Sequence, residues 1–459
     1  ALDRLRLTHP HPAQLRWLDA LVLSVELAVR RLRKPQPRIL APTPEPRIAA
    51  LAPEEAPVAR LQPLERLLLC LHGGFGQPRR VRVVAPRRQP AAHRRIAGEL
   101  LTRRPQSLLF ADGPVPHPAA RPGEPAQGVR GAGCGAQLEA EGSTHLTLPV
   151  HKKSLSSLWQ IRPLRKLIQQ HRPDILHVRS RVPAWLAHFA LRGMPAGQRP
   201  HLISTVHGFY SVNRYSQIMT QAEKVIAVSD SVVKYITDHY KNCPPQDIVR
   251  IYRGIDPLAF PHGYQPSAIW LNQTFKDFPE LENKFVLCLP GRITRLKGHE
   301  TLIALVQQLQ QQYPQLHAVV VGGADPKKAA YLKEMQNSIQ AKGLSEKITF
   351  AGHRADIREW LAFSDAVLSL SNQAETFGRT ALEALSVGTP VIGWNRGGVA
   401  EILSNIYPQG LIEADDQAAL LNAVKKHIDA PQPVAPVTMF SLKDMCGQTL
   451  SLYRQVAQQ

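Results

Sequence analysis

The sequence predicts an α/β protein with two parallel sheets, each covered by helices. Short apolar runs of strand length alternate with helical segments from about Gln137 onward, and strands that alternate with helices form parallel sheets covered on both faces. The series is interrupted once, over 257–283, where Pro and aromatic residues show no clear period. We therefore expect this segment to connect two sheets. The first 135 residues lack the pattern, and this third of the chain is predicted to be irregular.

Nine short apolar runs are predicted as strands: 175–178, 202–206, 224–228, 248–252, 285–289, 318–321, 348–350, 366–370 and 390–393. Segments with apolar residues at helical spacing lie between them: 158–171, 231–239, 299–312, 329–342, 358–363 and 379–387. The expected division is an anomalous segment 1–135, the remainder of a first domain 136–256, a connection 257–283, a second domain 284–436, and a helix within 437–459 that can pack back on the first domain.

The first 135 residues have an unusual composition. They contain 19 of the 39 prolines, 21 Arg but one Lys, and no Tyr, Asn or Met. Because Pro interrupts helices and central strands, only 16–33 and 91–104 look helical, and only 81–84 suggests a strand. Two interpretations stay open. The segment is either a disordered basic extension or part of the first domain read in a shifted frame, since GC-rich coding DNA gives such a composition out of frame.

Charge and cysteine content limit the possible partners and compartments. The formal charge of +20 divides into +12 for residues 1–135 and +8 for residues 136–459, and such a charge attracts nucleic acid, acidic membranes or phosphorylated substrates alike. The five Cys are far apart and have no metal or redox spacing, which predicts a reducing compartment and no structural metal. No apolar run approaches the roughly 18 residues that span a bilayer. We expect a cytoplasmic protein, with peripheral attachment to the inner membrane left open.

A glycine-flanked basic loop follows the predicted strand 285–289. It contains Arg292, Lys297 and Gly298 just before a helix. Ligands of open parallel sheets bind beyond the carboxyl ends of strands, and Arg and Lys together can hold a diphosphate. Taken alone, the loop is better explained as a solvated basic surface.

A second loop, after the predicted strand 366–370, carries carboxylates. Glu375 lies in the loop and Glu383 about two turns into the following helix, so the two can reach opposite ends of an elongated ligand. Carboxylates accept hydrogen bonds from hydroxyls of sugar and ribose, and Gly378 allows a phosphate to approach the helix N-terminus. The alternative is that Glu375 caps the helix and Glu383 lies on its solvated face.

These motifs in this order resemble the retaining family 4 glycosyltransferases (glycosyl transferases group 1). The resemblance covers residues 137–459 and rests on the following residues: Gly291-Arg292, Lys297-Gly298, the E-x7-E element from Glu375 to Glu383 with Phe377-Gly378, Gly388-Thr389-Pro390, and Gly397-Gly398 with Glu401. It implies the GT-B fold, in which two Rossmann-like domains with parallel sheets face a central cleft.

The resemblance also implies roles for individual residues. Arg292, Lys297 and Gly378 would bind the donor diphosphate, and Glu375 with the backbone of Phe377 and Gly378 would bind the transferred sugar. The nucleoside would contact the remaining predicted residues: Glu383, Gly352, His353 and Arg354. His207, in the loop after the predicted strand 202–206, would act beside Glu375 in catalysis, whereas His177 is interpreted as structural. No metal and no cofactor are expected apart from a UDP-, GDP- or ADP-sugar as donor substrate.

The opening of the family pattern is the weakest part of the resemblance. The family begins with a strand and a Gly-Gly loop, and only 67–76 fits this in outline. The residues that follow do not start a convincing helix, so we interpret this segment as a chance match.

The function expected from the resemblance is transfer of a sugar, with retention, to a glycan or lipid-linked acceptor, in bacterial lipopolysaccharide or envelope polysaccharide synthesis. Two alternatives stay open. The chain could be an inactive nucleotide-sugar-binding protein with a defective first third. It could also bind nucleic acid through its Arg-rich first third, although no aromatic residues are interleaved with those arginines, so no nucleic-acid partner is expected.

Overall fold

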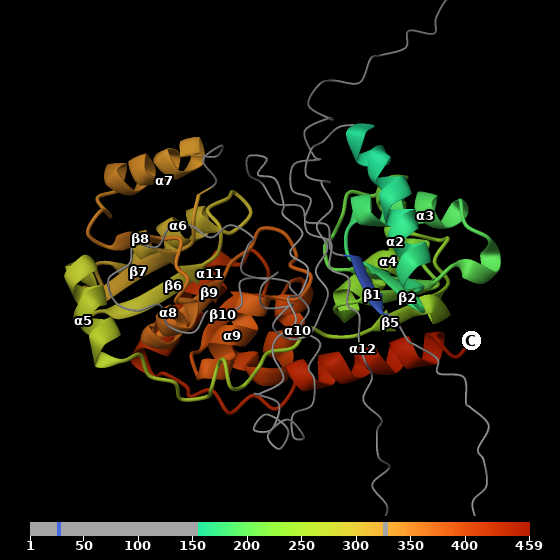
Figure 1. Ribbon diagram of the computed structural model, residues 1–459. Helices are drawn as coiled ribbons and strands as arrows, with labels where there is room; N and C mark the ends of the chain where they lie inside the picture. Colours follow the sequence, from blue (N-terminus) through green and yellow to red (C-terminus); the bar gives the residue numbers. More distant parts are fainter. Residues whose placement is uncertain (1–24, 29–154, 325–328) are drawn as a thin grey trace, which may run out of the picture.

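The computed structural model describes residues 25–28, 155–324 and 329–459. Its helices and strands form two lobes, each built around one sheet (Figure 1). The predictions for 81–84 and 91–104 lie outside the described residues. None of the described helices is long and apolar enough to cross a bilayer.

The first sheet has the strand order β1-β2-β3-β4-β5. Its strands are β1 (Val25–Ala28), β2 (Ile175–Val178), β3 (His201–Val206), β4 (Lys224–Ala227) and β5 (Ile248–Arg250). Strands β2 to β5 are parallel, as predicted. The first strand differs, because β1 pairs antiparallel with β2 and lies within 16–33, where a helix was predicted. The helices of this lobe are η3 (Leu155–Gln160), α2 (Ile161–His171), α3 (Arg181–Arg192) and α4 (Asp230–His239).

The second sheet is parallel throughout, in the order β11-β10-β9-β6-β7-β8. Its strands are β6 (Phe285–Pro290), β7 (Leu316–Val321), β8 (Ile348–Gly352), β9 (Ala366–Ser369), β10 (Val391–Trp394) and β11 (Leu411–Ile412). Its helices are α6 (His299–Leu309), α7 (Ala329–Ala341), α8 (Ile357–Phe363), α9 (Arg379–Val387), α10 (Gly397–Ile406) and α11 (Gln417–Asp429). The order reverses between β6 and β9, and such a switch point is where ligands bind in doubly wound sheets.

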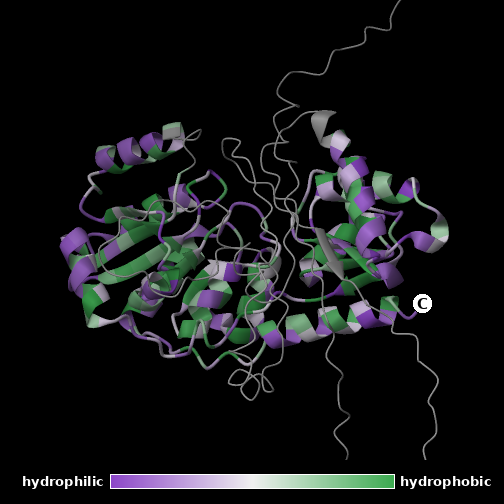
Figure 2. Ribbon diagram, viewed as in Figure 1, coloured by the Kyte–Doolittle hydropathy of each residue, from purple (hydrophilic) through white to green (hydrophobic). Residues whose placement is uncertain are grey.

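The burial of the strands explains why these segments could be recognised as strands from the sequence. Every residue of β7 is buried, and so is every residue of β10, because helices cover both faces of a parallel sheet. The strands are accordingly the most uniformly hydrophobic parts of both lobes (Figure 2).

The segment 257–283 is more regular than the sequence suggested. It contains the helix α5 (Ala268–Asp277), capped by the Ser267 hydroxyl. The Trp270 indole of this helix donates a hydrogen bond to Asp356 at 2.7 Å and meets Trp360 edge to face. The segment therefore packs on the second domain, and its aromatic residues are the anchors.

Two segments of the chain run side by side between the domains. One contains Ile255 and leads from the first domain to the second, and the other contains Phe440 and Leu442 and leads back. The amide of Ile255 donates to the carbonyl of Phe440 at 2.9 Å, and the amide of Leu442 donates to the carbonyl of Ile255 at 2.8 Å. A side chain at Gly254 would place its Cβ 2.3 Å from the Ser441 carbonyl. Glycine is therefore required for this close approach.

The last helix, α12 (Leu442–Val456), packs on the first sheet and not on the second (Figure 1). Its Met445, Leu452 and Tyr453 side chains form one buried cluster with Ile175, Ile203 and Ile226 of the first sheet and with Ile251, which follows β5. The His177 ring joins this helix to the sheet, with Nδ1 2.5 Å from the Tyr453 hydroxyl and Nε2 2.7 Å from the Thr205 hydroxyl. The structural role predicted for His177 is confirmed.

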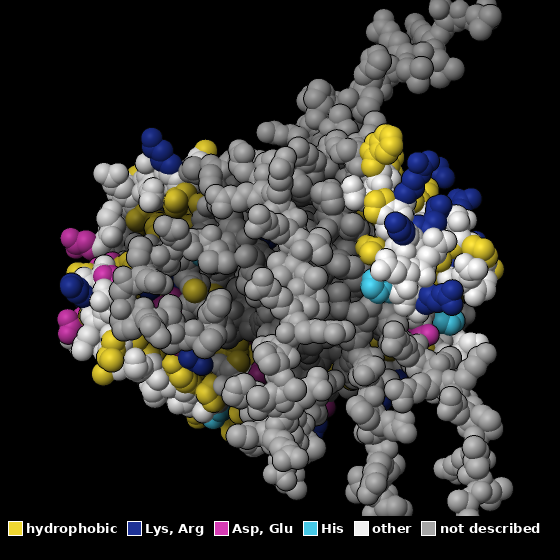
Figure 3. Space-filling view, in the orientation of Figure 1, with side chains coloured by type: hydrophobic (Ala, Val, Ile, Leu, Met, Phe, Trp, Pro, Cys, Tyr) yellow, Lys and Arg dark blue, Asp and Glu magenta, His cyan; other side chains and the backbone are white. Residues whose placement is uncertain are grey.

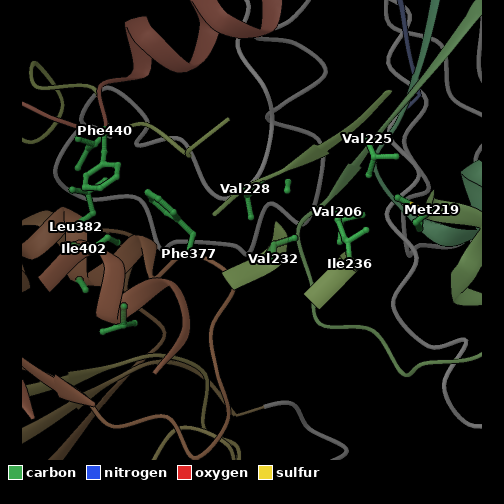
Figure 4. Close-up of a cluster of buried hydrophobic side chains, with 14 of the residues drawn as sticks. Val206, Met219, Val225, Val228, Val232, Ile236, Phe377, Leu382, Ile402 and Phe440 are labelled. Carbon is green, nitrogen blue, oxygen red and sulfur yellow. The ribbon is translucent and has the colours of Figure 1, made fainter. Parts of the chain in front are cut away.

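One buried cluster continues from the first domain into the second. It includes Val206 and Val232 of the first domain, Phe377 and Leu382 of the second, and Phe440 of the segment that returns to the first (Figure 4). Burial of apolar area contributes about 25 cal/mol per Å², so this shared core stabilises the two domains in this arrangement.

Candidate active site

A small pocket lies at the switch point of the second sheet, at the carboxyl ends of β6 and β9. Its walls include Pro290 at the end of β6, Lys297 from the loop after β6, Ser371 and Glu375 from the loop after β9, and Thr380 from the first turn of α9. The structure thus brings together the two loops that the sequence singled out separately.

Glycines shape the basic loop that follows β6. Gly291 has a φ of 145°, and the Lys297 side chain crosses it so closely that an added Cβ would lie 3.3 Å from Lys297 Cδ. Gly298 has a φ of 74°, and an added Cβ there would lie 2.0 Å from the Leu370 carbonyl. Only glycine fits both positions, and the result is that Lys297 is directed toward the loop after β9.

Lys297 and Glu375 form an ion pair in the pocket. The Lys297 Nζ lies 2.6 Å from Glu375 Oε1, and their side chains are 29% and 28% exposed. The Ser371 hydroxyl donates to the same oxygen at 2.5 Å. Burial by itself would raise the pKa of Glu375, but the Lys297 charge and the two hydrogen bonds outweigh it and hold this pKa below its ordinary value. Glu375 is therefore a carboxylate at neutral pH.

The N-terminus of α9 completes the pocket. Gly378, which precedes the helix, has a φ of 91°, and an added Cβ would lie 2.7 Å from the Val399 side chain. The first helical turn has amide groups without intrahelical acceptors, and together with the helix dipole they attract an anion. Thr380 and Ala381 of this turn line the pocket. A phosphate in the pocket would therefore meet Lys297 and the start of α9.

Glu383 lies one turn into α9, not two as expected, because the helix begins at Arg379. Its side chain is only 13% exposed and forms an ion pair with Arg379 at 3.1 Å. Burial raises its pKa above the ordinary value, and Arg379 offsets only part of that effect. The alternative of a solvated helix face is therefore wrong for Glu383.

The first domain brings His207 to the same site. The Thr376 hydroxyl, next to Glu375, donates to the backbone carbonyl of His207 at 2.9 Å. This contact joins the loop after β3 to the loop after β9. The two residues predicted to be catalytic, His207 and Glu375, thus come from different domains and lie on loops in direct contact.

The remaining predicted residues lie at different places around the pocket. Phe377 has a buried side chain that packs on Phe440 and Tyr252, with ring centroids 5.7 and 6.2 Å away, so only its backbone could face a ligand. Arg292 is exposed on the basic loop.

The residues predicted to meet the nucleoside base follow β8. Gly352 ends this strand with a φ of 73°, and His353 is exposed. The Arg354 guanidinium is held by Asp356 through two contacts of 3.1 Å. Arg354 thus supports its own loop, and its contact with a base stays a prediction. Within the described residues, no group of three or more His, Cys, Asp or Glu side chains is placed to hold a metal ion.

Glu401 has a role that the sequence did not reveal. Its carboxylate, on α10, accepts hydrogen bonds from the amides of Asp230 and Ser231, at 2.9 and 2.7 Å, and from the Ser231 hydroxyl at 2.5 Å. These groups form the N-terminus of α4 in the first domain. Glu401 is therefore a helix cap supplied across the domain interface. Sequence spacing could not show this, because the contact joins residues 170 positions apart.

The Glu401→Ala variant is expected to be less stable than the natural chain by about 1 to 2 kcal/mol, the usual cost of losing a helix cap. Thermal unfolding would measure the loss. Glu346→Ala, which removes an exposed glutamate from the second domain, is the matched control. If both variants unfold at the temperature of the natural chain, Glu401 does not hold the domains together.

Comparison with known families agrees with this architecture. Residues 272–435 match the family described as Glycosyl transferases group 1, and residues 68–257 match Glycosyltransferase Family 4. Together the two matches cover most of the chain, and the protein belongs to the group 1 glycosyltransferases. The second match begins within 67–76, so the segment that the sequence analysis treated as a chance match is included in it.

Curated relatives are similar over part of their length. The D-inositol 3-phosphate glycosyltransferase of Stackebrandtia nassauensis is 27% identical over 56% of this chain and 61% of its own. The lipopolysaccharide core biosynthesis mannosyltransferase LpsB of Rhizobium meliloti is 29% identical over 32% of this chain and 42% of its own. The chain thus spans less than two thirds of the length of either relative.

Solved structures share the fold. A glycosyltransferase from Rickettsia africae superimposes with a TM-score of 0.61 at 23% identity, over 70% of this chain and 87% of its own. Anabaena Alr3699/HepE, solved with UDP and glucose, gives a TM-score of 0.57 at 24% identity, over 70% of this chain and 88% of its own. The protein has the GT-B fold.

Proposed function

We propose that this protein transfers a hexose-like sugar, with retention at the anomeric carbon and without a metal ion, from a nucleotide-diphosphate donor to a glycan or lipid-linked acceptor. The observation that carries the proposal is the pocket at the switch point, where Lys297, Glu375 and the N-terminus of α9 meet the His207 loop. The pocket offers positive charge for a diphosphate and a carboxylate for sugar hydroxyls within one site.

The donor would lie along the carboxyl edge of the second sheet. Lys297, the exposed Arg292 and the amides of α9 would stabilise the negative charge that develops on the departing diphosphate, which is the charge role that a metal plays elsewhere. Glu375 would accept hydrogen bonds from the sugar, and Glu383 from the ribose.

The acceptor would approach from the first domain. The bond between the anomeric carbon and the diphosphate oxygen breaks as the acceptor hydroxyl bonds to the same carbon on the same face, and the hydroxyl proton passes to an oxygen of the departing diphosphate. His207 would lie next to this carbon. Beyond it, the Arg181 guanidinium stacks 4.7 Å above the Tyr210 ring. An aromatic and cationic wall of this kind fits a glycan that carries phosphate groups.

The relatives support an envelope pathway. Two of them are lipopolysaccharide core mannosyltransferases of Rhizobium species, each 29% identical over about a third of this chain. Another solved form of Anabaena Alr3699/HepE contains UDP-glucose. We therefore propose a bacterial envelope glycan as the acceptor and place UDP-sugars first among candidate donors, before GDP- and ADP-sugars.

A thermal-stability screen with UDP-, GDP- and ADP-sugars tests donor binding. One class of donor should raise the unfolding temperature, because a ligand at 100 times its Kd stabilises the folded state by about 2.7 kcal/mol. The Lys297→Met variant should lose most of this shift, whereas Lys333→Met, at an exposed position on α7, should keep it. No shift with any sugar nucleotide would overturn the proposal. A shift without hydrolysis or transfer to any acceptor would favour the inactive binding protein.

A further inference from the structure

One surface of the first domain combines exposed apolar side chains with cations. We call it the α2–α3 surface. It is formed by η3, α2 and the end of α3, and its defining residues are Leu158, Trp159, Arg162, Lys166, Phe189 and Arg192. Trp159 is 73% exposed, Leu158 47% and Phe189 38%. Large apolar side chains are costly to leave in water, and a group of them marks a site of interaction.

The cations and the apolar side chains share one face. Arg162 and Lys166 lie four residues apart on α2, a spacing that places them on one side of the helix, and Trp159 lies near the end of η3, directly before α2. The opposite side of α2 is buried through Leu164 and Ile168. The exposed side therefore presents tryptophan and positive charge together.

The end of α3 belongs to the same surface. The Arg165 guanidinium, from α2, donates to the carbonyls of Ala190 and Phe189 at 3.1 and 3.2 Å. These contacts hold Phe189, and Arg192 three residues further, beside α2.

Within residues 155–459, the excess positive charge lies in the first domain and not in the second. Residues 155–256 contain 14 Lys and Arg against 6 Asp and Glu, a net charge of +8, whereas residues 257–459 contain 18 of each and are neutral. Residues 155–172 contain no acidic residue. Figure 3 shows the contrast on one face, where Lys and Arg lie among hydrophobic side chains over the lobe with α2 and α3, while the other lobe carries both signs.

We propose that the α2–α3 surface docks on a lipid bilayer that carries anionic headgroups. Tryptophan favours the interface between water and lipid, Leu158 and Phe189 would enter the acyl boundary, and the cations would lie at the level of the headgroups. Nucleic acid would use the cations but would leave the exposed leucine and phenylalanine in water. The proposal goes beyond sugar transfer, since it assigns a surface away from the donor pocket.

Vesicle co-sedimentation of the full chain, without donor or acceptor, tests this proposal. The chain should bind vesicles of phosphatidylcholine with phosphatidylglycerol and should bind pure phosphatidylcholine far more weakly. Arg162→Gln with Lys166→Gln should weaken binding by roughly 25-fold, since each cation near an anionic surface contributes about fivefold. Trp159→Ser should weaken binding by about tenfold.

Matched variants on the second domain are the controls. Lys276→Gln with Lys333→Gln removes two exposed cations from the neutral domain, and Ile269→Ser removes an apolar side chain that is 83% exposed. Both should bind as the natural chain does. Each variant keeps all cations outside its own substituted positions, including those of residues 1–135, so a loss confined to the variants of the α2–α3 surface is due to that surface.

Three results would overturn the proposal. The first is equal binding of the natural chain to both kinds of vesicle. The second is a loss of vesicle binding in the control variants as large as that in the variants of the α2–α3 surface. The third is a Trp159→Ser variant that binds vesicles normally, together with competition between a random DNA duplex and vesicles for the natural chain. The last result would show a general polyanion surface. None of these results bears on the donor screen, so failure of this proposal and failure of the proposed function are distinguishable.

Discussion

Glu375→Gln is expected to lower the rate of sugar transfer by at least about 100-fold, as the loss of a positioning and electrostatic group does. The change keeps the size of the side chain but removes the charge that faces Lys297 at 2.6 Å. It leaves the Lys297 ammonium beside a neutral amide and removes the strongest acceptor for sugar hydroxyls in the pocket. Steady-state transfer from the donor identified by thermal stabilisation would measure the loss.

Two comparisons make this result specific. Glu346→Gln changes an exposed glutamate on the same domain and should leave the rate unchanged.

The pH dependence of stability is the second comparison. Because the pKa of Glu375 is lowered in the folded state, its stabilising contribution is complete above the ordinary pKa of about 4.3 and is lost as the pH falls through the lowered value. The stability difference between Glu375→Gln and the natural chain should therefore shrink in acid. A near-normal rate for the variant would remove Glu375 from the site.

Phe377→Ala is expected to destabilise the protein by about 3 kcal/mol or more, as truncation of a buried aromatic side chain does. The ring is 4% exposed and packs against both Tyr252 and Phe440, at the point where the two domains share one core. Truncation leaves a cavity under the loop that holds Glu375, so transfer should fall as well. Denaturant unfolding would measure the change in free energy of unfolding.

Leu296→Ala is the control for this truncation, because Leu296 is 48% exposed and lies on the neighbouring basic loop. It should cost well under 1 kcal/mol, as surface substitutions usually do. If Phe377→Ala costs no more than Leu296→Ala, the shared core does not hold the domains in this arrangement.

Strands and the donor loops were predictable from the sequence because local composition determines them. The second sheet is covered on both faces, so its strands are continuous apolar runs with clear limits, and β6 and β9 differ from their predictions by one residue. The Glu375 and Lys297 loops follow directly from those strands. Their pairing in one pocket also follows from the switch point of a doubly wound sheet.

Helices with an irregular start were missed for local reasons. Pro183 lies in the first turn of α3, where proline is tolerated but gives a pattern that looks like a break. Gly397 and Gly398 open α10, and their closeness to Glu375 and Phe377 explains why glycine is needed there. The reason for the two glycines is not visible until the neighbouring segment is known.

The contacts between domains were beyond sequence reasoning. Thr376 reaches the carbonyl of His207 across 169 residues of chain, and Glu401 caps α4 across 170. Such contacts depend on how two separately folded sheets meet, and no spacing within a single segment records that arrangement.

The packing of α12 has a consequence for the order of folding during synthesis. A domain usually folds as soon as it has emerged from the ribosome, but the first sheet here has to wait. Its apolar face, with Ile175, Ile203 and Ile226, is covered by residues that follow the whole second domain in the chain. The second domain can therefore be complete while the first still exposes this face. A nascent chain stalled before Leu442 would leave this apolar face open to chaperone binding.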